Sequence, residues 1–355
     1  MPLTKKQHFA RMDDTSSLVW RVLEQSTDEM IRNHNLATIK PHIEVLFSRR
    51  RGKHLLRPYV GRLLATLAQQ DWKSSCNLKL LASIEALNLS TYHANFAFDN
   101  KAGVSDSGDR NGQFVAAMLL RELAQSLISD AFSCDTQAQC AAISLCSQVN
   151  QCVYVGQHLD MHVLTHDAVG QFDLPAFEEK YYARCILMCG ATFRLTMLPL
   201  LLSSLEDDVK QCCHSLLNHL GAGIQAINDL ADFDVLSKRT YADSFSDLLN
   251  QRLTLPAYLL HASGASLEML RDKVKTQRSN PSLLLQSAQE IKSMISVHDI
   301  LNFVLRRCWQ PIRLHLRFLH RRLRQQREAL MMFDFIPHLL FESRLVKSFQ
   351  SLSTP

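Results

Sequence analysis

The stretch LGAGIQAINDLADFD, residues 220–234, joins small and apolar residues to a tight group of polar ones. On a helix, Asn228 and Asp232 share a face because they are four residues apart, with Asp229 beside them and Gln225 one turn earlier. Carboxylate and amide oxygens are the ligands that Mg²⁺ prefers. Taken alone, the stretch fits a magnesium site and a helix end with solvated acidic residues equally well.

A second stretch, IEALNLSTYHANFAFDN at residues 84–100, repeats the pattern. It is apolar at helical spacing and ends in Asn95 and Asp99, again four residues apart. Two such helices can face each other across a cavity and clamp metal ions that bridge a diphosphate. The two stretches together therefore predict a magnesium site. Its ligands would be Asn95, Asp99, Asn228, Asp229 and Asp232.

The composition favours an all-α fold. The chain has 355 residues, of which 46% are hydrophobic, with only 11 glycines and 10 prolines. Helical patterns follow one another from about residue 16 to about residue 350 without a linker, so a single domain over residues 1–355 is expected. Asp13 and Asp14 are expected to act as an N-cap. The most apolar run, residues 195–205, is too short to span a bilayer.

Cysteine placement and charge bear on compartment and partners. Four of the ten cysteines recur every six residues in an apolar helical pattern, and the N-terminus carries no secretory signal, so we expect reduced thiols in a cytoplasmic protein. The net charge of +5 is mild, and no nucleic acid partner is expected. His158, His162 and His166 lie at helical spacing, but no acidic residue lies at helical spacing with them, which favours an ordinary helix surface over a metal site.

The order of the motifs resembles the trans-isoprenyl diphosphate synthases (polyprenyl synthetases), whose fold is shared with class I terpene synthases. The second aspartate-rich motif of that family matches Leu220, Gly221, Ile224, Gln225, Asn228, Asp229, Asp232 and Phe233. Shorter motifs match Gly52, Lys53, Arg57 and Pro58, then Arg110, then Gly156, Gln157 and Asp160, and finally Lys238, Asp247, Arg252, Thr254, Leu255 and Pro256. The resemblance covers about residues 50–260.

The resemblance implies an isoprenoid synthase-type helical bundle around a central cavity, with Mg²⁺ as cofactor and a prenyl diphosphate as substrate. It assigns diphosphate binding to Lys53, Arg57, Arg110, Lys238 and Arg252. It assigns catalysis to Asp99, Asp229, Asp232 and Arg110. The family is usually dimeric, so a homodimer, or a heteromer with a related synthase, is expected.

Several family positions are changed in this chain. The first motif keeps only Asp99 of its three aspartates, and Asn228 replaces the first aspartate of the second motif. Asn88 stands where the family has a histidine that helps to bind isopentenyl diphosphate, and Asn111 replaces an arginine. Each charge-assisted phosphate contact contributes about 1.5–3 kcal/mol, so the two losses weaken isopentenyl diphosphate binding by roughly 10²–10⁴-fold.

These changes favour a terpene-synthase-like enzyme, which needs one diphosphate pocket and an apolar cavity. Such an enzyme would ionise an allylic prenyl diphosphate through Mg²⁺ and convert the carbocation to a terpene. The expected cavity residues are Tyr92, Phe96, Phe98, Met161, Met188, Phe193 and Gln225. Two alternatives remain open: a divergent prenyltransferase that condenses isopentenyl diphosphate, and a non-catalytic partner subunit of a prenyl diphosphate synthase.

Two further expectations follow. Asp232→Ala should lower turnover by about a hundredfold or more, because charge stabilisation of the leaving group is lost, and should hardly change stability, because alanine preserves the helix. The basic helical C-terminal segment, residues 300–350, has eight arginines between residues 306 and 327 with leucine, tryptophan and phenylalanine among them. This segment is most simply a solvated amphipathic helix, and it is also a candidate for peripheral contact with an anionic membrane.

Overall fold

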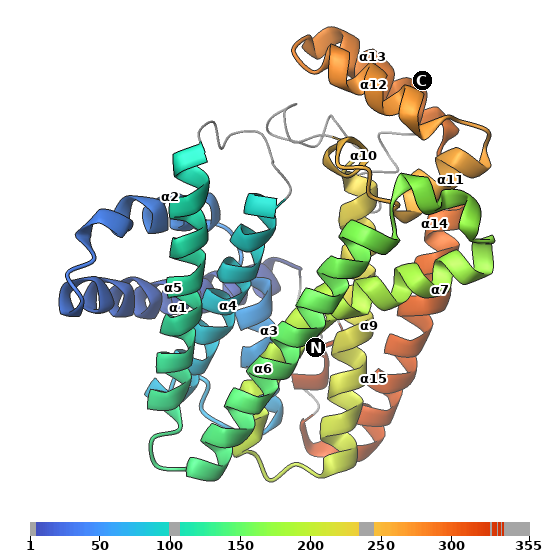
Figure 1. The fold of residues 1–355 in the computed structure, drawn as a ribbon. Helices are drawn as coiled ribbons and strands as arrows, with labels where there is room; N and C mark the ends of the chain where they lie inside the picture. Colours follow the sequence, from blue (N-terminus) through green and yellow to red (C-terminus); the bar gives the residue numbers. More distant parts are fainter. Residues whose placement is uncertain are drawn as a thin grey trace.

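The computed structural model shows a bundle of helices (Figure 1) and describes residues 5–98, 107–233, 245–326 and six positions from 329 to 336. These residues contain no β-strand, and the only strand-like pairing among them is a bridge between Thr165 and Arg252. The predicted all-α fold is therefore confirmed. The first half consists of α1 (Lys5–Asn33), α2 (Lys40–Arg50), α3 (Leu56–Leu67), α4 (Ser75–Phe98), α5 (Ser107–Ala131) and α6 (Thr136–His158).

The second half begins with two short turns, the π-helical η2 (Leu159–Val163) and the 3₁₀ η3 (His166–Gln171). Then follow α7 (Leu174–Cys185), π-helical η4 (Ile186–Gly190), α8 (Ala191–Arg194), η5 (Leu195–Leu202) and α9 (Asp207–Ala231). The remaining helices are α10 (Ser246–Leu249), α11 (Leu255–Ala262), α12 (Leu267–Gln277), α13 (Pro281–Met294), α14 (Val297–Val304), π-helical η8 (Leu305–Trp309) and α15 (Gln310–Arg322).

Short polar side chains start several helices. Asp135 accepts a hydrogen bond from the backbone N–H of Ala138 at 2.9 Å and caps α6, and Asp173 caps α7 in the same way. The expected N-cap at Asp13 and Asp14 is wrong. Helix α1 already begins at Lys5, so both aspartates lie inside it and form ion pairs with side chains outside the helix.

Helical geometry continues without interruption from residue 174 to residue 202. This run is long and apolar enough to span a membrane by composition, so it is longer than the apolar stretch read from the sequence. In the structure, however, 61% of its most apolar window is buried inside the bundle. The run packs against α9 and α3 and is the central helix of a folded core.

Two apolar cores hold the bundle together. One is built from α1, α2, α4, α5 and α6, and the other from α3, α7, α9 and the helices that follow α10. In Figure 1, α1, α2, α4 and α5 lie on the left of the molecule and α7, α9, α14 and α15 on the right, and α6 runs between the two groups. Buried apolar surface of this kind contributes about 25 cal/mol per Å² to folding.

Two glycines let the central helix touch α9. A Cβ atom on Gly221 would lie 2.5 Å from the Cα of Gly190 and 2.6 Å from the carbonyl oxygen of Cys189. Both are backbone atoms, which cannot move aside as a flexible side chain can. Gly221 in the 220–234 stretch therefore allows a close contact between α9 and the central helix.

We expect Gly221→Ala to destabilise the protein by about 1–3 kcal/mol, because the helices must separate. Gly170→Ala is the matched control, since a Cβ atom there meets nothing within 4 Å. Urea unfolding of the two variants and the parent checks this expectation. Equal midpoints for Gly221→Ala and Gly170→Ala would contradict it.

Candidate functional site

The ends of α4 and α9 and the start of α5 lie at the same end of the bundle (Figure 1). This is the end at which the sequence predicts a metal clamp. Asp99 and Lys238 lie outside the described residues, and so do the side chains of Tyr92, Asn95, Phe96, Phe98 and Arg110. The opposing wall of the clamp and these assignments therefore stay predictions, and the α9 side can be examined in detail.

Asp229 is buried at the end of α9, with 2% of its surface exposed. Its Oδ2 accepts hydrogen bonds from the Tyr181 hydroxyl at 2.7 Å and from the Arg184 guanidinium at 2.6 Å. Its Oδ1 accepts one from the Gln225 amide at 2.7 Å. Burial, reinforced by the neighbouring carboxylate, raises the pKa of the Tyr181 phenol well above its usual value. Tyr181 thus remains a neutral donor.

Arg184 links this carboxylate to a second one. Its Nε lies 2.6 Å from Oδ1 of Asp160, and its side chain is 3% exposed. Arg252 approaches the same aspartate, with Nε 3.3 Å from Oδ2 and one guanidinium N–H donating to the Asp160 carbonyl at 3.2 Å. Burial favours the neutral guanidine, but Asp160 and Asp229 outweigh it, and the pKa of Arg184 lies well above its ordinary value. We call Asp160, Arg184, Asp229 and Arg252 the aspartate–arginine network.

Backbone geometry positions the network. Asp160 lies in the π-helical turn η2, and π-turns often occur at functional sites. Arg252 follows α10 and is held against η2 because Leu253 N–H donates to Leu164 and His166 N–H donates to Gln251. Arg184 was not among the site residues predicted from the sequence. The available signal was that the otherwise apolar segment at residues 183–202 contains only two charged residues, Arg184 and Arg194.

Asp232, at the end of α9, forms hydrogen bonds with residues at the start of α10. Its carboxylate accepts hydrogen bonds from the Ser246 hydroxyl at 3.0 Å and from the Asp247 backbone N–H at 2.8 Å. Its own carbonyl accepts from the Phe245 N–H at 2.9 Å, and the residue is 6% exposed. Asp232 therefore links the end of α9 to the start of α10. The expectation that its removal leaves stability unchanged is wrong, because a buried donor would lose its partner.

We expect Asp232→Ala to lower the free energy of unfolding by about 1–3 kcal/mol, because the Asp247 N–H and the Ser246 hydroxyl lose their acceptor. Ser246→Ala removes only one of the two donors and should have a smaller effect. Chemical denaturation of both variants measures the difference. An unchanged midpoint for Asp232→Ala would show that these hydrogen bonds between the ends of α9 and α10 do not contribute to stability.

The described residues do not fit a magnesium cluster. Each carboxylate oxygen of Asp229 and Asp232 already accepts a hydrogen bond from the protein, and Asp160 is paired with two arginines. Within the described ranges, no group of three His, Cys, Asp or Glu side chains has a geometry that could hold a metal ion. Asn228, by contrast, is exposed at the end of α9.

A second polar cluster lies between α2, α3 and α4, where the resemblance places the pocket for isopentenyl diphosphate. Glu85 is fully buried, and its Oε1 accepts from Arg50 at 3.4 Å and from the Asn88 amide at 3.3 Å. Burial raises the pKa of Glu85, although Arg50 and Arg57 act against it. The Arg57 guanidinium donates to the Thr192 hydroxyl at 2.9 Å. We call Arg50, Arg57, Glu85 and Asn88 the glutamate cluster.

The remaining predicted residues have various environments. Lys53 is exposed, and Met161 and Met188 are half-buried. Phe193 is fully buried, with the Arg57 guanidinium 4.6 Å from its ring centre, so it is part of the packed core. Gln225 is half-buried and donates to Asp229. Their roles as cavity or diphosphate-binding residues stay predictions.

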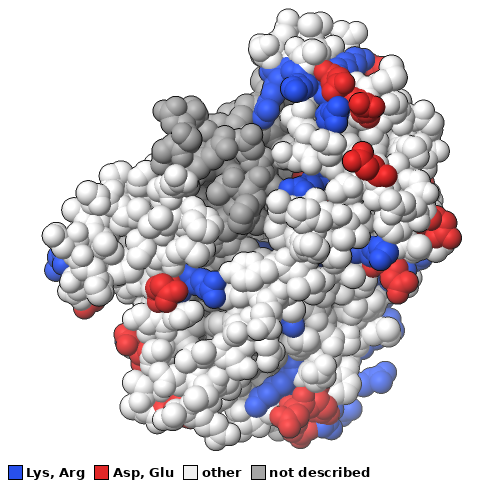
Figure 2. Space-filling view, viewed as in Figure 1, with Lys and Arg blue, Asp and Glu red and all other residues white. Residues whose placement is uncertain are grey.

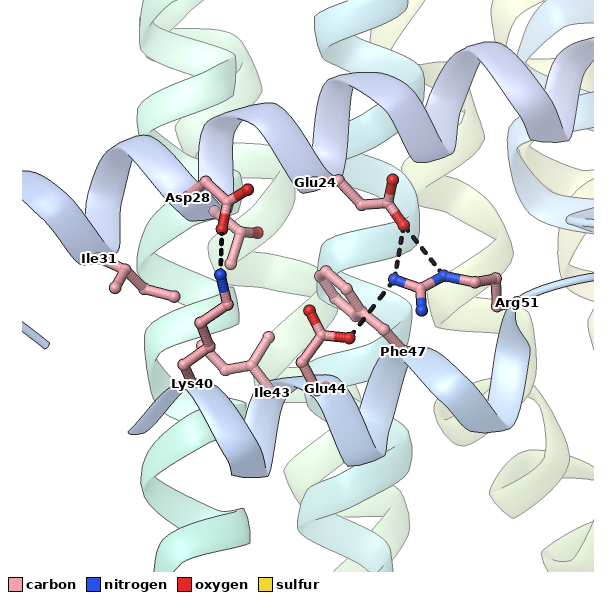
Figure 3. Close-up of a pocket in the computed structure, with 9 residues that line it drawn as sticks. Glu24, Asp28, Ile31, Lys40, Ile43, Glu44, Phe47 and Arg51 are labelled. Carbon is pink, nitrogen blue, oxygen red and sulfur yellow. Dashed lines mark hydrogen bonds and ion pairs between the residues drawn. The ribbon is translucent and has the colours of Figure 1, made fainter. Parts of the chain in front are cut away.

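A pocket of about 400 Å³ lies away from this end, between α1 and α2 (Figure 3). Ion pairs cross it: Lys40 contacts Asp28 at 2.9 Å, and Arg51 contacts Glu24 at 2.6 Å. Ile43 and Phe47 form part of its lining. The pairs join the two helices, and we assign this pocket no part in the site.

The ten cysteines form no disulfide, and the histidine series is not continuous on one helix. All ten cysteines are free thiols, as predicted, and six of them are buried. Helical structure ends at residue 163, so His166 lies in the separate turn η3 and not on the face of His158 and His162. Burial lowers the pKa of His166 to about 4.

Comparisons with known proteins agree with this fold. The polyprenyl synthetase family matches residues 98–291. A putative geranylgeranyl pyrophosphate synthase from Corynebacterium glutamicum is 16% identical, with a TM-score of 0.66 over 90% of this chain and 96% of that one. Geranylgeranyl pyrophosphate synthetase from Pyrococcus horikoshii is 14% identical, with a TM-score of 0.65 over 93% and 98%.

A polyprenyl synthase from Caulobacter crescentus, solved with calcium and isoprenyl diphosphate, is 16% identical, with a TM-score of 0.63 over 91% of this chain and 96% of that one. No curated protein matches the sequence. Because the family match covers more than half of the chain, the chain belongs to the polyprenyl synthetase family, a family of transferases. The low identities make it a divergent member.

Proposed function

We propose that this protein binds one allylic prenyl diphosphate at the end of the bundle where α4 and α9 terminate, and acts on it without isopentenyl diphosphate. The product would be a terpene, as in a terpene-synthase-like lyase. Family membership supports a prenyl diphosphate as substrate. The glutamate cluster supports the restriction to a single diphosphate.

The charges of the glutamate cluster are the reason to expect a single diphosphate. A second diphosphate needs cationic side chains that face it. Here Arg50 is paired with buried Glu85, and Arg57 is held by Thr192 and lies over Phe193. Asn88 is neutral and directs its amide at Glu85. Turning either arginine toward a substrate would leave a buried acceptor or donor without a partner, which costs about 1–3 kcal/mol.

The chain's own contribution to the reaction would be binding, orientation and exclusion of water. Arg110 and Lys238, assigned by the resemblance, are the proposed counter-charges for the departing diphosphate. Arg252 contacts Asp160 in the described structure, so we propose that it positions η2 and does not reach the substrate. Since the described carboxylates do not fit Mg²⁺, no step is assigned to a metal.

Product analysis with geranyl, farnesyl and geranylgeranyl diphosphates tests the proposal. Each is supplied with and without isopentenyl diphosphate. We expect apolar product from at least one allylic substrate alone, and no longer-chain diphosphate when isopentenyl diphosphate is added. Chain elongation at ordinary enzyme rates, of order 1–10³ s⁻¹, would instead make the protein a prenyltransferase.

The aspartate–arginine network favours a second candidate, a non-catalytic partner subunit of a prenyl diphosphate synthase. Carboxylates that are already paired with arginines would explain a chain with no turnover of its own.

The exposed face of α6 fits a partner: this helix contains no Asp, Glu, Lys or Arg and exposes Ile143, Tyr154 and Val155. Depletion of charge and exposed aromatic residues are typical of interfaces. We propose that this face binds a second copy or a related synthase in the cytoplasm, and Val155→Glu should then reduce the mass measured by sedimentation.

Helix α15 and the short turn that follows it carry a basic stripe, which we define as Arg313, Arg317, Arg321 and Arg324. All four are exposed, and none forms an ion pair with an acidic residue of the described chain. Leu314 beside them is 62% exposed. Basic side chains gather at the lower edge of the molecule near α15 (Figure 2). We propose that this stripe contacts an anionic membrane, the phase into which a prenyl chain partitions.

Each basic residue near an anionic membrane contributes about 1 kcal/mol, so four predict roughly 10³-fold tighter binding to anionic than to neutral vesicles. Co-sedimentation with phosphatidylserine-containing and pure phosphatidylcholine vesicles measures this ratio. Replacing the four arginines by glutamine should abolish the difference, and added salt should weaken it. Equal binding to both kinds of vesicle would exclude membrane contact by the stripe.

A further inference from the structure

We propose that Arg184 is the resident cation of this site and prevents Asp160 and Asp229 from binding a divalent metal ion. The inference concerns the resting protein, and it holds whether or not the chain turns over a prenyl diphosphate. It rests on the contacts of one guanidinium group. That group lies 2.6 Å from a carboxylate oxygen of Asp229 and 2.6 Å from one of Asp160.

Arginine suits this position because its planar guanidinium presents several N–H donors in a fixed fork and stays protonated. The Nε atom of Arg184 forms an ion pair with Asp160, and a terminal nitrogen of the same guanidinium donates to Asp229. A single side chain therefore joins η2 to α9. All three residues are almost fully buried. Two carboxylates this deeply buried need a compensating positive charge. Here the side chain of Arg184 provides that charge.

The network is already balanced in charge. Asp160 and Asp229 carry two negative charges, and Arg184 and Arg252 carry two positive charges. A divalent ion bound to Asp229 would therefore meet the guanidinium of Arg184 at close range and be repelled. It would also have to displace the donors of Tyr181 and Gln225.

Helix geometry keeps Arg184 in this place. Tyr181 and Arg184 are three residues apart on α7, so they project from the same face, and both donate to the same oxygen of Asp229. The arginine is therefore anchored by its helix, by two carboxylates and by a neighbouring donor. A metal ion could enter only if the guanidinium were removed.

The test is a metal titration without any prenyl diphosphate. Thermal unfolding and Mn²⁺ or Mg²⁺ calorimetry are measured on the wild-type chain and on Arg184→Met, each against EDTA. We expect no metal response from the wild type. We expect Arg184→Met to be less stable in EDTA and to gain about 3 °C in Tm at a metal concentration 100 times its Kd.

Arg306→Met is the matched control, because it also removes an arginine from a carboxylate, Glu178, but away from the network. It should show no metal response. A folded Arg184→Met without metal response overturns the proposal. So does micromolar metal binding by the wild type that is lost in Asp229→Asn. If Arg184→Met does not fold, the wild-type titration decides alone. Since no substrate is present, none of these outcomes depends on the proposed function.

Discussion

Asp229→Ala is expected to destabilise the protein by about 3–5 kcal/mol, because it leaves part of a buried ion pair without its partner. Arg184 would keep its contact with Asp160, but the nitrogen that donates to Asp229 would lose its acceptor. Tyr181 and Gln225 would each lose an acceptor. Guanidinium or urea unfolding in EDTA measures the change.

Asn228→Ala is the control, because its side chain lies next in sequence but is exposed. We expect it to change stability by no more than about 0.5 kcal/mol. If Asp229 were a metal ligand in the resting protein, its removal would relieve repulsion between acidic groups and would be tolerated in EDTA. Similar midpoints for the two variants would therefore argue against the aspartate–arginine network.

Asn88→His combined with Asn111→Arg is expected to raise condensation of isopentenyl diphosphate by about 100-fold or more. The double change returns a hydrogen-bond donor and a positive charge to the second diphosphate pocket, and each such contact contributes about 1.5–3 kcal/mol. A histidine at position 88 can still donate to Glu85, as the Asn88 amide does. The measurement is kcat/KM for isopentenyl diphosphate at a fixed concentration of farnesyl diphosphate.

Asn88→Gln combined with Asn111→Gln keeps both positions neutral and should leave condensation at the parent level. If the parent already elongates at ordinary enzyme rates, the loss of the cationic pocket has no consequence and the prenyltransferase interpretation is correct. If the double variant gains nothing and no allylic diphosphate is turned over, the partner-subunit interpretation gains support. Binding of farnesyl diphosphate should be measured for the parent and for the Asn88→His/Asn111→Arg variant. Binding without turnover would show that the allylic pocket is present but that the chemical step is lost.

The sequence by itself determined the helices, their order and the family. Helical periodicity is a local property, so it predicted a chain of successive helices without a linker, and the spacing of the aspartate-rich motif at 225–233 pointed to the fold. The local sequence pattern mispredicted the start of the first helix, because the same residues are compatible with two different helix starts. Asp13 and Asp14 could cap a helix or lie within one, and contacts with His54 and Arg62 decided for the second.

The tertiary structure decided what the acidic residues of the site contact. Arg184 is 24 residues from Asp160 and 45 from Asp229, so no local pattern connects them. They meet because Gly190 and Gly221 let the central helix approach α9. The sequence shows which residues could bind a metal. Only helix packing shows which of their oxygens are already satisfied, because hydrogen bonding and burial depend on neighbours distant in the chain.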